Sequence, residues 1–330
     1  MKLFAAVAVF AAVALLIGFG WMRSARIPDP VRRTQVALGT FVEIEVRGMA
    51  APKANRAIDA AFQEVQRIHR TFSPFNESGR LWRVNHSPEE TVTVDRELYD
   101  LLLACDVIHR ETEGAFDPAM EKLFEVWRVW GNDPVIPARD AVEQALALSG
   151  WRHVGLGDDL ELRRKPGVAI SFGAIAKGYA VDRMVETLES CGVRSALVNA
   201  GGEIRTLGDD WIVGVQHPSI RREMVRTISL SGMAVATSGD YEQSHEEKGV
   251  RYHHILNPAT GYPATGCSSV TIVARTCMEA DAYATGVFVL GPVQGLALVN
   301  RTPGMDAMVI DRAGAIFYSN HFEDYVWRRP

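Results

Sequence analysis

The stretch from Ile170 to Gly208 constrains the fold more than any other part of the sequence. It opens with the small residues GAIAKG at 173–178, whose short side chains let a ligand approach the backbone closely. Apolar residues then recur at three- and four-residue spacing up to Leu188, which predicts a helix, and Gly192 is placed to end it. The glycine spacing matches neither the dinucleotide-binding fingerprint nor the P-loop. Free N–H groups at a helix start beside Lys177 suit a phosphate or pyrophosphate, and a tight packing turn is the competing interpretation.

The other patterns predict mainly helices in the first half of the chain and mainly strands in the second. Helices are expected at 53–70, 98–108, 124–130 and 141–148, a loop at 72–85, a hairpin at 154–168, and strands at 34–46, 195–199, 203–207, 211–215, 227–230, 234–237, 253–256 and 270–274. These elements interleave without a βαβ rhythm, and no linker separates the halves. The sequence therefore predicts one α+β domain rather than a doubly wound sheet.

The N-terminus has a different composition from the rest. Residues 3–21 form an unbroken run of apolar residues and glycine, which is just long enough to cross a bilayer and is flanked by basic residues. We expect an exported protein in which residues 1–26 are a membrane anchor or a signal segment, with an uncleaved anchor favoured. A linker at 27–33 and a single domain at 34–330 follow. The formal charge of −5 argues against nucleic acid as a partner.

The cysteines show no CxxC spacing. Three of the four lie inside apolar segments, which favours buried free thiols. A bridge between Cys267 and Cys277 is left open, since an oxidising compartment would permit it.

A predicted helix at 278–285 carries the first candidate metal ligands. Asp281 and Thr285 are four residues apart and so share a helix face. A carboxylate and a hydroxyl are hard oxygen ligands that suit magnesium, and a backbone carbonyl from the Gly173-Ala174 loop is a candidate third ligand. The alternative is an exposed face on which Thr285 bonds back to its own turn.

Two polar turns carry further candidates. In the segment 252–263, His253 and His254 alternate along a strand, so they face opposite ways and one of them is a candidate general base. A half-buried histidine at a strand end is the simpler interpretation. The turn at 114–118 presents an aromatic ring and Asp117, which is either a ligand contact or a local cap.

Several of these segments together resemble one known family. GAFDP, GAIAKGYAVD, NAGGEIRTLG, ATSGDY, HHILNPATGYP and MEADAYAT occur in the order expected for the ApbE family of FAD:protein FMN transferases. The similarity runs from about Thr34 to beyond Gly291. It implies a single ApbE-like domain with mixed or antiparallel sheets and flanking helices.

The resemblance also implies an activity and a location. Members of this family bind FAD and Mg²⁺, break the pyrophosphate, release AMP and transfer FMN through a phosphodiester bond to a threonine or serine of an acceptor protein. The implied acceptor is a membrane redox subunit. With the N-terminal anchor, the implied location is the periplasmic side of the bacterial inner membrane.

The resemblance assigns roles to individual positions. The magnesium ligands would be the carbonyl of Ala174, Asp281 and Thr285. His254 would be the catalytic residue, helping to deprotonate the acceptor hydroxyl and contacting the flavin nucleotide. The other FAD contacts would be Leu38, Phe75, Ala115, Phe116, Asp117, Ser171 and Lys177.

The sequence departs from the family pattern at several positions. Ser171 and Asn257 stand where aspartate is usual, Ala259 where a basic residue is usual, and Phe75 where tyrosine is common. Two alternatives to the transferase therefore stay open. One is an FAD pyrophosphatase that forms FMN and AMP with water as the acceptor, and the other is an envelope protein that binds FAD without chemistry.

Overall fold

The computed structural model describes residues 28–328 apart from 130, 132–134, 209, 221, 242–243 and 248–249. The expected N-terminal anchor, residues 1–26, lies outside the described residues. The first strand begins at Val31, inside the stretch 27–33 that the sequence predicts as a linker.

The described chain forms helices and antiparallel strands, which confirms the predicted α+β class. The helices are α2 (Ala51–Phe72), α3 (Arg80–His86), α4 (Arg96–Glu111), α5 (Glu121–Trp127), α6 (Arg139–Ala147), α7 (Ala176–Ser190) and α8 (Cys277–Arg301), with the 3-10 turns η1 (Trp151–His153) and η2 (Phe322–Tyr325). The strands are β1 (Val31–Ala37), β2 (Thr40–Val46), β3 (Thr91–Thr93), β4 (Val154–Leu156), β5 (Glu161–Arg164), β6 (Ala196–Ala200), β7 (Glu203–Leu207), β8 (Trp211–Gln216), β9 (Met224–Leu230), β10 (Ala234–Gly239), β11 (Ser244–Glu247), β12 (Val250–His253), β13 (Cys267–Ala274), β14 (Asp306–Asp311) and β15 (Ile316–Tyr318).

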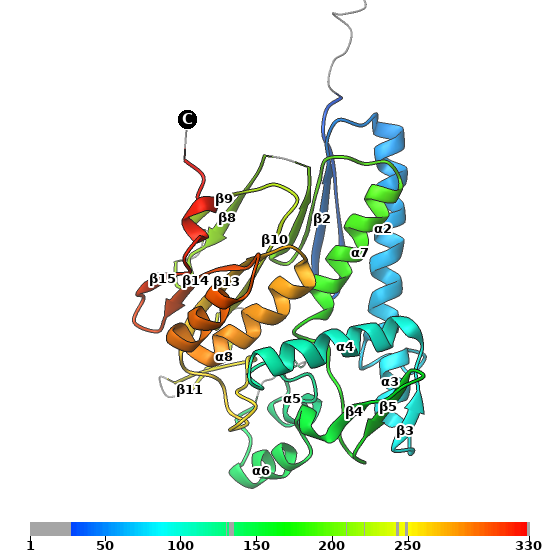
Figure 1. The fold of residues 1–330 in the computed structure, drawn as a ribbon, viewed down its shortest axis with the longest axis vertical. Helices are drawn as coiled ribbons and strands as arrows, with labels where there is room; N and C mark the ends of the chain where they lie inside the picture. Colours follow the sequence, from blue (N-terminus) through cyan, green and yellow to red (C-terminus); the bar gives the residue numbers. More distant parts are fainter. Residues whose placement is uncertain are drawn as a thin grey trace, which may run out of the picture.

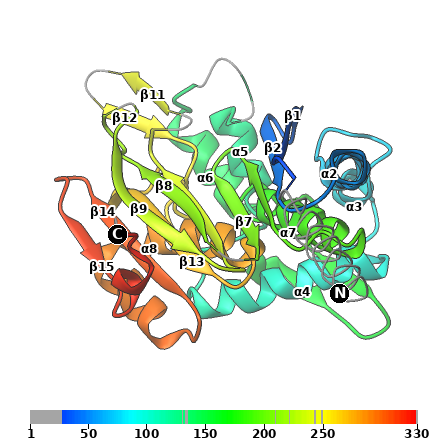
Figure 2. The same ribbon diagram turned by 90° about the horizontal axis from the view of Figure 1, so that it is seen from above.

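An eight-stranded sheet of order β1-β2-β6-β7-β10-β13-β14-β15 is the centre of the molecule. Helices α2, α7 and α8 pack on one face of this sheet (Figure 1). The two-stranded ribbon β8-β9 covers the other face, and Figure 2 shows this ribbon and α8 on opposite sides of β13. The remaining helices and the small sheet β3-β5-β4 gather at one end of the molecule (Figure 1).

The burial pattern of the strands follows from these layers. In β2, Val42, Ile44 and Val46 are fully buried under the helices, as period-2 alternation predicts. Strand β13 is buried on both faces, with Ile272 in the core under the helices and Val273 in the core under the β8-β9 ribbon. The sheet therefore separates two apolar cores and holds the loops at its ends in fixed positions.

Some elements differ from the sequence prediction. The loop expected at 72–85 contains α3, a short polar helix whose only buried residues are Leu81 and Val84, too few to show a period. The strand expected at 253–256 lies earlier, as β12, and the chain leaves it after His253. Both errors come from short segments in which tertiary packing outweighs local pattern.

The start of α8 is fixed by a buried carboxylate on α7. Asp182 accepts hydrogen bonds from the backbone N–H of Cys277 at 2.8 Å and of Met278 at 2.9 Å. Its Oδ1 also accepts from Arg205 Nη1 at 2.7 Å. A carboxylate at a helix N-terminus satisfies N–H groups that have no partner within the helix and complements the helix dipole. Asp182 thus ties α7, α8 and β7 together.

Helix α8 is a core helix in two parts. Gly291 has a φ of 81° inside it, and Pro292 begins the second part. Among the described helices only α8 is long and apolar enough to cross a bilayer, and 56% of that stretch is buried inside the protein, as in the core helix of a globular domain.

The cysteines are free within the structure. Cys105, Cys267 and Cys277 are buried, which confirms the predicted buried thiols, and Cys191 is exposed. Burial raises the pKa of the Cys267 thiol to about 12, so this thiol is protonated at neutral pH.

Replacing Asp182 tests its importance for the fold. We expect Asp182→Ala to lower the free energy of unfolding by roughly 3–5 kcal/mol, because it leaves Arg205 and two backbone N–H groups without their acceptor. Urea titration monitored by circular dichroism measures the change. The exposed Asp59, which pairs with Arg33, is the matched control, and Asp59→Ala should cost less than about 1 kcal/mol. Equal losses for the two variants would contradict the assignment.

Candidate active site

One large cavity opens where the end of the sheet meets the helical end of the molecule. Its volume is about 1280 Å³, enough for a dinucleotide-sized ligand. Every site residue expected from the sequence lines it: Leu38, Phe75, Ala115, Phe116, Asp117, Ser171, Ala174, Lys177, His254, Asp281 and Thr285. The structure therefore brings together segments that are up to 247 positions apart in the sequence, from 38 to 285.

The tight turn between β1 and β2 forms one wall of the cavity. Leu38 and Gly39 have φ angles of 54° and 74°, as a two-residue hairpin turn requires. A positive φ is unfavourable for leucine, so the hairpin holds Leu38 in a strained conformation against the cavity. Phe75 follows α2 on the same wall and is 64% exposed at the cavity mouth.

Asp281 is a buried carboxylate in the wall of the cavity. Its Oδ2 accepts a hydrogen bond from the Gly178 backbone N–H at 2.9 Å. Burial raises the pKa of the Asp281 carboxyl, while the positive charge of Lys177 and the Gly178 N–H oppose the rise. Lys177 in turn pairs through Nζ with Glu203 Oε1. We call Lys177, Glu203 and Asp281 the charged corner of the cavity.

Gly178 is required for this contact. A Cβ at this position would lie 2.2 Å from the carbonyl oxygen of Cys277 and 2.8 Å from the Cβ of Asp281. Only a residue without a side chain lets α7 approach α8 closely enough for the N–H to reach the carboxylate. The motif GAIAKG thus forms the tight packing turn that was the competing interpretation of this segment. A packing turn does not exclude a phosphate-binding role for the same residues.

The donors around Asp281 fit a hard divalent cation. Thr285 lies one turn further along α8, and its Oγ1 is 3.3 Å from Ser238 Oγ. The hydroxyl of Thr285 therefore has a partner outside its own helical turn. Within the described residues, no three or more His, Cys, Asp and Glu side chains form a metal-binding group. The Asp281 carboxylate and the Thr285 hydroxyl both line the cavity and would offer oxygen donors to a cation. An all-oxygen set is suited to magnesium.

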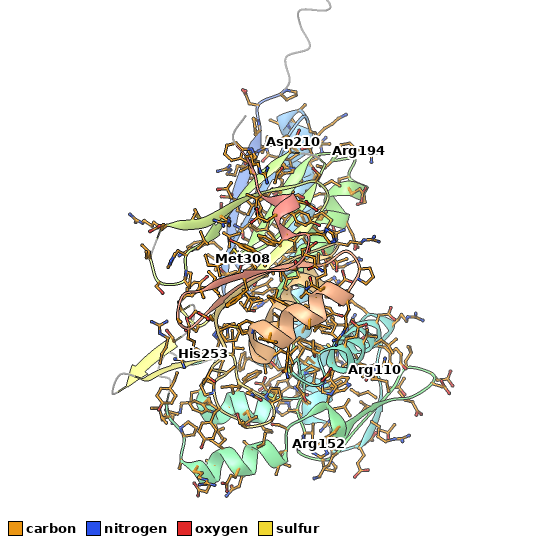
Figure 3. The ribbon with its side chains drawn as sticks, turned by 60° about the vertical axis from the view of Figure 1, so that its left-hand side comes forward. Arg110, Arg152, Arg194, Asp210, His253 and Met308 are labelled. Atoms are coloured by element: carbon orange, nitrogen blue, oxygen red, sulfur yellow. The ribbon has the colours of Figure 1, made fainter. Side chains whose placement is uncertain are left out.

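The two adjacent histidines have different environments. His253 is buried, its Nδ1 accepts from the Ile255 N–H at 3.3 Å, and its Nε2 therefore donates to the Ala264 carbonyl at 2.9 Å. Burial lowers the pKa of His253, which favours a neutral, structural ring. Figure 3 shows His253 at a level between Met308 of the sheet and Arg152 of the helical end. His254 is half-buried and lines the cavity, so of these two histidines it is the one available for chemistry.

The turn at 114–118 is held by Asp117. Its Oδ1 accepts from the Ala119 N–H at 2.8 Å and its Oδ2 from the Trp151 N–H at 2.9 Å. Burial raises the pKa of Asp117, and these two N–H groups oppose the rise. The cap predicted from the sequence is therefore present, and it places Ala115 and Phe116 on the cavity wall.

Several lining residues were not predicted from the sequence. Phe124, Trp127 and Tyr252 form an aromatic part of the wall, with the Trp127 and Tyr252 rings 5.9 Å apart. Glu203 completes the charged corner, and Ser238 contacts Thr285. A lone carboxylate directly after Gly201-Gly202 was a signal for Glu203, whereas the aromatic residues carry no pattern distinguishable from core packing.

The departures from the family pattern differ in their consequences. Asn257 does not line the cavity, and its Oδ1 accepts from the Ala259 N–H at 2.9 Å, as the carboxylate of aspartate would. Ser171 is buried and lines the cavity, where its Oγ accepts from the Gly173 N–H at 3.4 Å. Of these two positions, only Ser171 changes the charge of the cavity wall.

Comparisons with known proteins agree with this geometry. The sequence profile of the ApbE family matches residues 38–309. The chain is 31% identical over 322 residues to the FAD:protein FMN transferase of Treponema pallidum, covering 90% of this chain and 89% of that protein. It is similar to the crystal structure of an ApbE protein from Thermotoga maritima, with a TM-score of 0.85, 36% identity and coverage of 91% and 100%. It is also similar to the flavinyl transferase ApbE of Pseudomonas stutzeri, with a TM-score of 0.80, 26% identity and coverage of 93% and 100%.

A glycine-to-alanine exchange tests the α7–α8 contact. We expect Gly178→Ala to lower the free energy of unfolding by roughly 1–3 kcal/mol, because the new Cβ would overlap backbone atoms that cannot move independently. Gly155→Ala is the matched control, since its Cβ would meet nothing closer than 4.0 Å. Urea titration compares the two. A Gly178→Ala variant more stable than the wild type, as helix propensity alone predicts, would refute the close approach.

Proposed function

The chain belongs to the ApbE family, and we propose that it moves FMN from FAD to a threonine or serine of an acceptor protein in a magnesium-dependent reaction. The chain is an enzyme of the FAD:protein FMN transferase class, as its relatives' names indicate. The observation that supports the finer proposal most is that every residue assigned to FAD, magnesium and catalysis lines one cavity.

The cavity offers different surfaces to the two ends of FAD. Aromatic side chains line one part, where a flat ring system can stack, and the charged corner lines another. Lys177 is at the start of α7, so its ammonium group and the positive end of the helix dipole favour the pyrophosphate. Leu38, Phe75, Ala115, Phe116, Asp117, Ser171 and His254 are the further proposed FAD contacts.

Asp281, Thr285 and the Ala174 carbonyl are the proposed magnesium ligands. Asp281 is the only charged group among them, and its burial makes a nearby cation favourable. When bound, magnesium supplies charge neutralisation for the pyrophosphate of FAD. The Gly178 N–H holds one oxygen of Asp281 in place and so limits the orientations of the carboxylate.

His254 is the proposed general base. It takes the proton of the acceptor hydroxyl, whose oxygen forms a bond to the phosphorus on the FMN side of the pyrophosphate. The bond between this phosphorus and the bridging oxygen breaks, and AMP leaves with that electron pair. The products are AMP and a phosphodiester between FMN and the acceptor.

The location remains part of the proposal. We place the enzyme on the periplasmic side of the inner membrane, anchored by residues 3–21, because this apolar run precedes the domain. A membrane redox subunit with an exposed threonine is then the natural acceptor.

The test uses the purified chain with FAD, magnesium and an acceptor domain that carries a threonine. AMP release and the mass of the acceptor are followed together. We expect a mass gain equal to FMN that disappears when EDTA is added. We expect Asp281→Ala to slow this reaction at least about a hundredfold, since it removes the only charged magnesium ligand.

Other outcomes separate the alternatives. AMP and free FMN without an acceptor adduct would indicate a pyrophosphatase, and bound, intact FAD would indicate a binding protein. Unchanged FAD consumption by Asp281→Ala would refute the magnesium site even if transfer occurs.

The base is tested by His254→Ala. We expect FAD affinity to change only slightly, while the transfer rate falls by roughly 10²- to 10⁴-fold, the usual contribution of a general base. FAD binding is measured by flavin fluorescence and transfer by the acceptor mass. His321→Ala, at an exposed histidine outside the cavity, is the control. Acceptor labelling at the wild-type rate by His254→Ala would exclude this role.

A further inference from the structure

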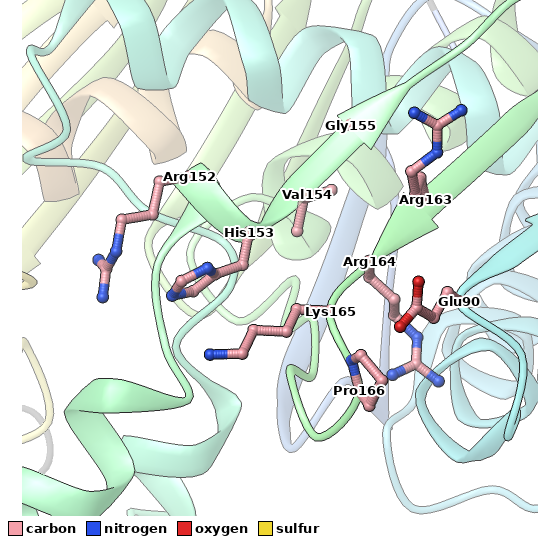
Figure 4. A pocket seen from close by; sticks show the side chains of 9 residues that line it. All are labelled: Glu90, Arg152, His153, Val154, Gly155, Arg163, Arg164, Lys165 and Pro166. Atoms are coloured by element: carbon pink, nitrogen blue, oxygen red, sulfur yellow. The ribbon is translucent and has the colours of Figure 1, made fainter.

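A second cavity lies where η1 meets the hairpin β4-β5 (Figure 4). Its volume is about 330 Å³, against 1280 Å³ for the active-site cavity, and the two share no lining residue. We call it the basic pocket, after its lining residues Arg152, His153, Arg163, Arg164 and Lys165. The rest of its lining is Glu90, Val154, Gly155 and Pro166.

The basic side chains approach the pocket from neighbouring positions. The Lys165 N–H donates to the His153 carbonyl at 3.0 Å, which places these two residues opposite each other across the hairpin. Figure 4 shows the side chains of Arg152, His153 and Lys165 on the same side, while Arg163 points away from them. Three basic side chains thus gather over one small cavity.

The pocket carries an excess of positive charge among the described residues. Glu90 is the only carboxylate in the lining, and no ion pair within 4.0 Å joins a described carboxylate to Arg152, Arg164 or Lys165. Arg152 also donates to the Leu146 carbonyl at 3.4 Å and is attracted by the Asp117 carboxylate. Partial burial lowers the pKa of His153, the charges of Arg152 and Lys165 lower it further, and the Asp117 carboxylate opposes the shift. The His153 Nε2 atom is buried with no hydrogen-bond partner among the described residues. A chain with a net charge of −5 thus keeps a local excess of positive charge here.

Arg164 supplies a fixed charge in the wall of the pocket, where Figure 4 shows it next to Glu90. It is only 3% exposed, and its guanidinium donates to the carbonyls of Val84 at 3.1 Å, Ser87 at 2.6 Å and Val168 at 3.0 Å. These bonds to neutral carbonyls hold the guanidinium in place without cancelling its charge. A buried cation with no carboxylate partner favours an anion nearby.

We propose that the basic pocket binds a phosphate group, with Arg152 and Lys165 as direct partners and Arg164 as a fixed charge in the pocket wall. A phosphate dianion suits a site in which several cations converge, because arginine and lysine donate charge-assisted hydrogen bonds to its oxygens. The His153 Nε2 atom is a further partner for it. The volume admits a free phosphate or a lipid headgroup, and it is small for a dinucleotide.

Calorimetric titration of the full chain with inorganic phosphate tests this site. FAD and EDTA are kept in excess, so that the large cavity is filled and turnover is stopped. We expect saturable binding of phosphate that the double variant Arg152→Ala/Lys165→Ala weakens at least about tenfold. Arg194→Ala is the control, because this exposed arginine lies at the opposite end of the molecule from Arg152 (Figure 3).

Vesicles distinguish the two sources of phosphate. Flotation with phosphatidylglycerol or phosphatidylcholine vesicles compares the wild type with the double variant, and the apolar run at 3–21 is the same in both chains. A loss in the double variant of the preference for phosphatidylglycerol over phosphatidylcholine vesicles would support the proposal with a lipid headgroup as the ligand. Saturable binding of free phosphate without that loss would support it with a soluble phosphate.

The proposal is overturned if the double variant matches the wild type in both assays, or if the wild type binds neither probe. Thermal unfolding shows whether the double variant is folded. If it is not, the single variants Arg152→Gln and Lys165→Gln are used, which remove charge and keep most of the side-chain volume. Arg164 is left unchanged because its bonds to α3 and to Val168 are structural.

Discussion

The contact between α7 and α8 is the interaction on which the rest of the site depends. Gly178 on α7 donates to Asp281 on α8, and Asp182, one turn later on α7, accepts from Cys277, one turn earlier on α8. The two helices therefore run in opposite directions along a fixed register. One contact satisfies the N-terminus of α8, and the other orients a buried carboxylate toward the cavity. Both contacts depend on glycine at 178, because a Cβ there would overlap Cys277 and Asp281.

This register links the fold to the chemistry. Because Arg205 of β7 also binds Asp182, the sheet, α7 and α8 meet at one buried carboxylate. Strand β7 begins at Glu203, whose side chain pairs with Lys177 at the start of α7. The charged corner is thus assembled by the same three elements that form the core. A disturbance of the packing would move the charges, and a substitution in the site would weaken the fold.

The sequence predicted the elements of this site better than their assembly. The period of α7 predicted this helix, the strands expected at 195–199 and 203–207 are β6 and β7, and the predicted helix at 278–285 is the first part of α8. The roles of individual residues came from the order of motifs, since no spacing relates Leu38 to Thr285. The cap by Asp182 was not predicted, because a carboxylate in the middle of a helix gives no sign of the distant helix that it caps. Short elements such as α3 were missed for lack of a period.

Ser171 stands where the family pattern usually has aspartate, and this difference affects the charge of the cavity wall. The charged corner holds one positive group, Lys177, and two negative groups, Glu203 and Asp281, so its formal charge is −1. A further aspartate at 171 would make the cavity wall more negative and would favour a cation more strongly. It would also repel the phosphates of FAD more strongly when no cation is bound. If the cavity takes FAD and magnesium as proposed, the serine favours nucleotide binding at low magnesium and leaves Asp281 as the charged ligand for the metal. Asn257 keeps its turn without lining the cavity.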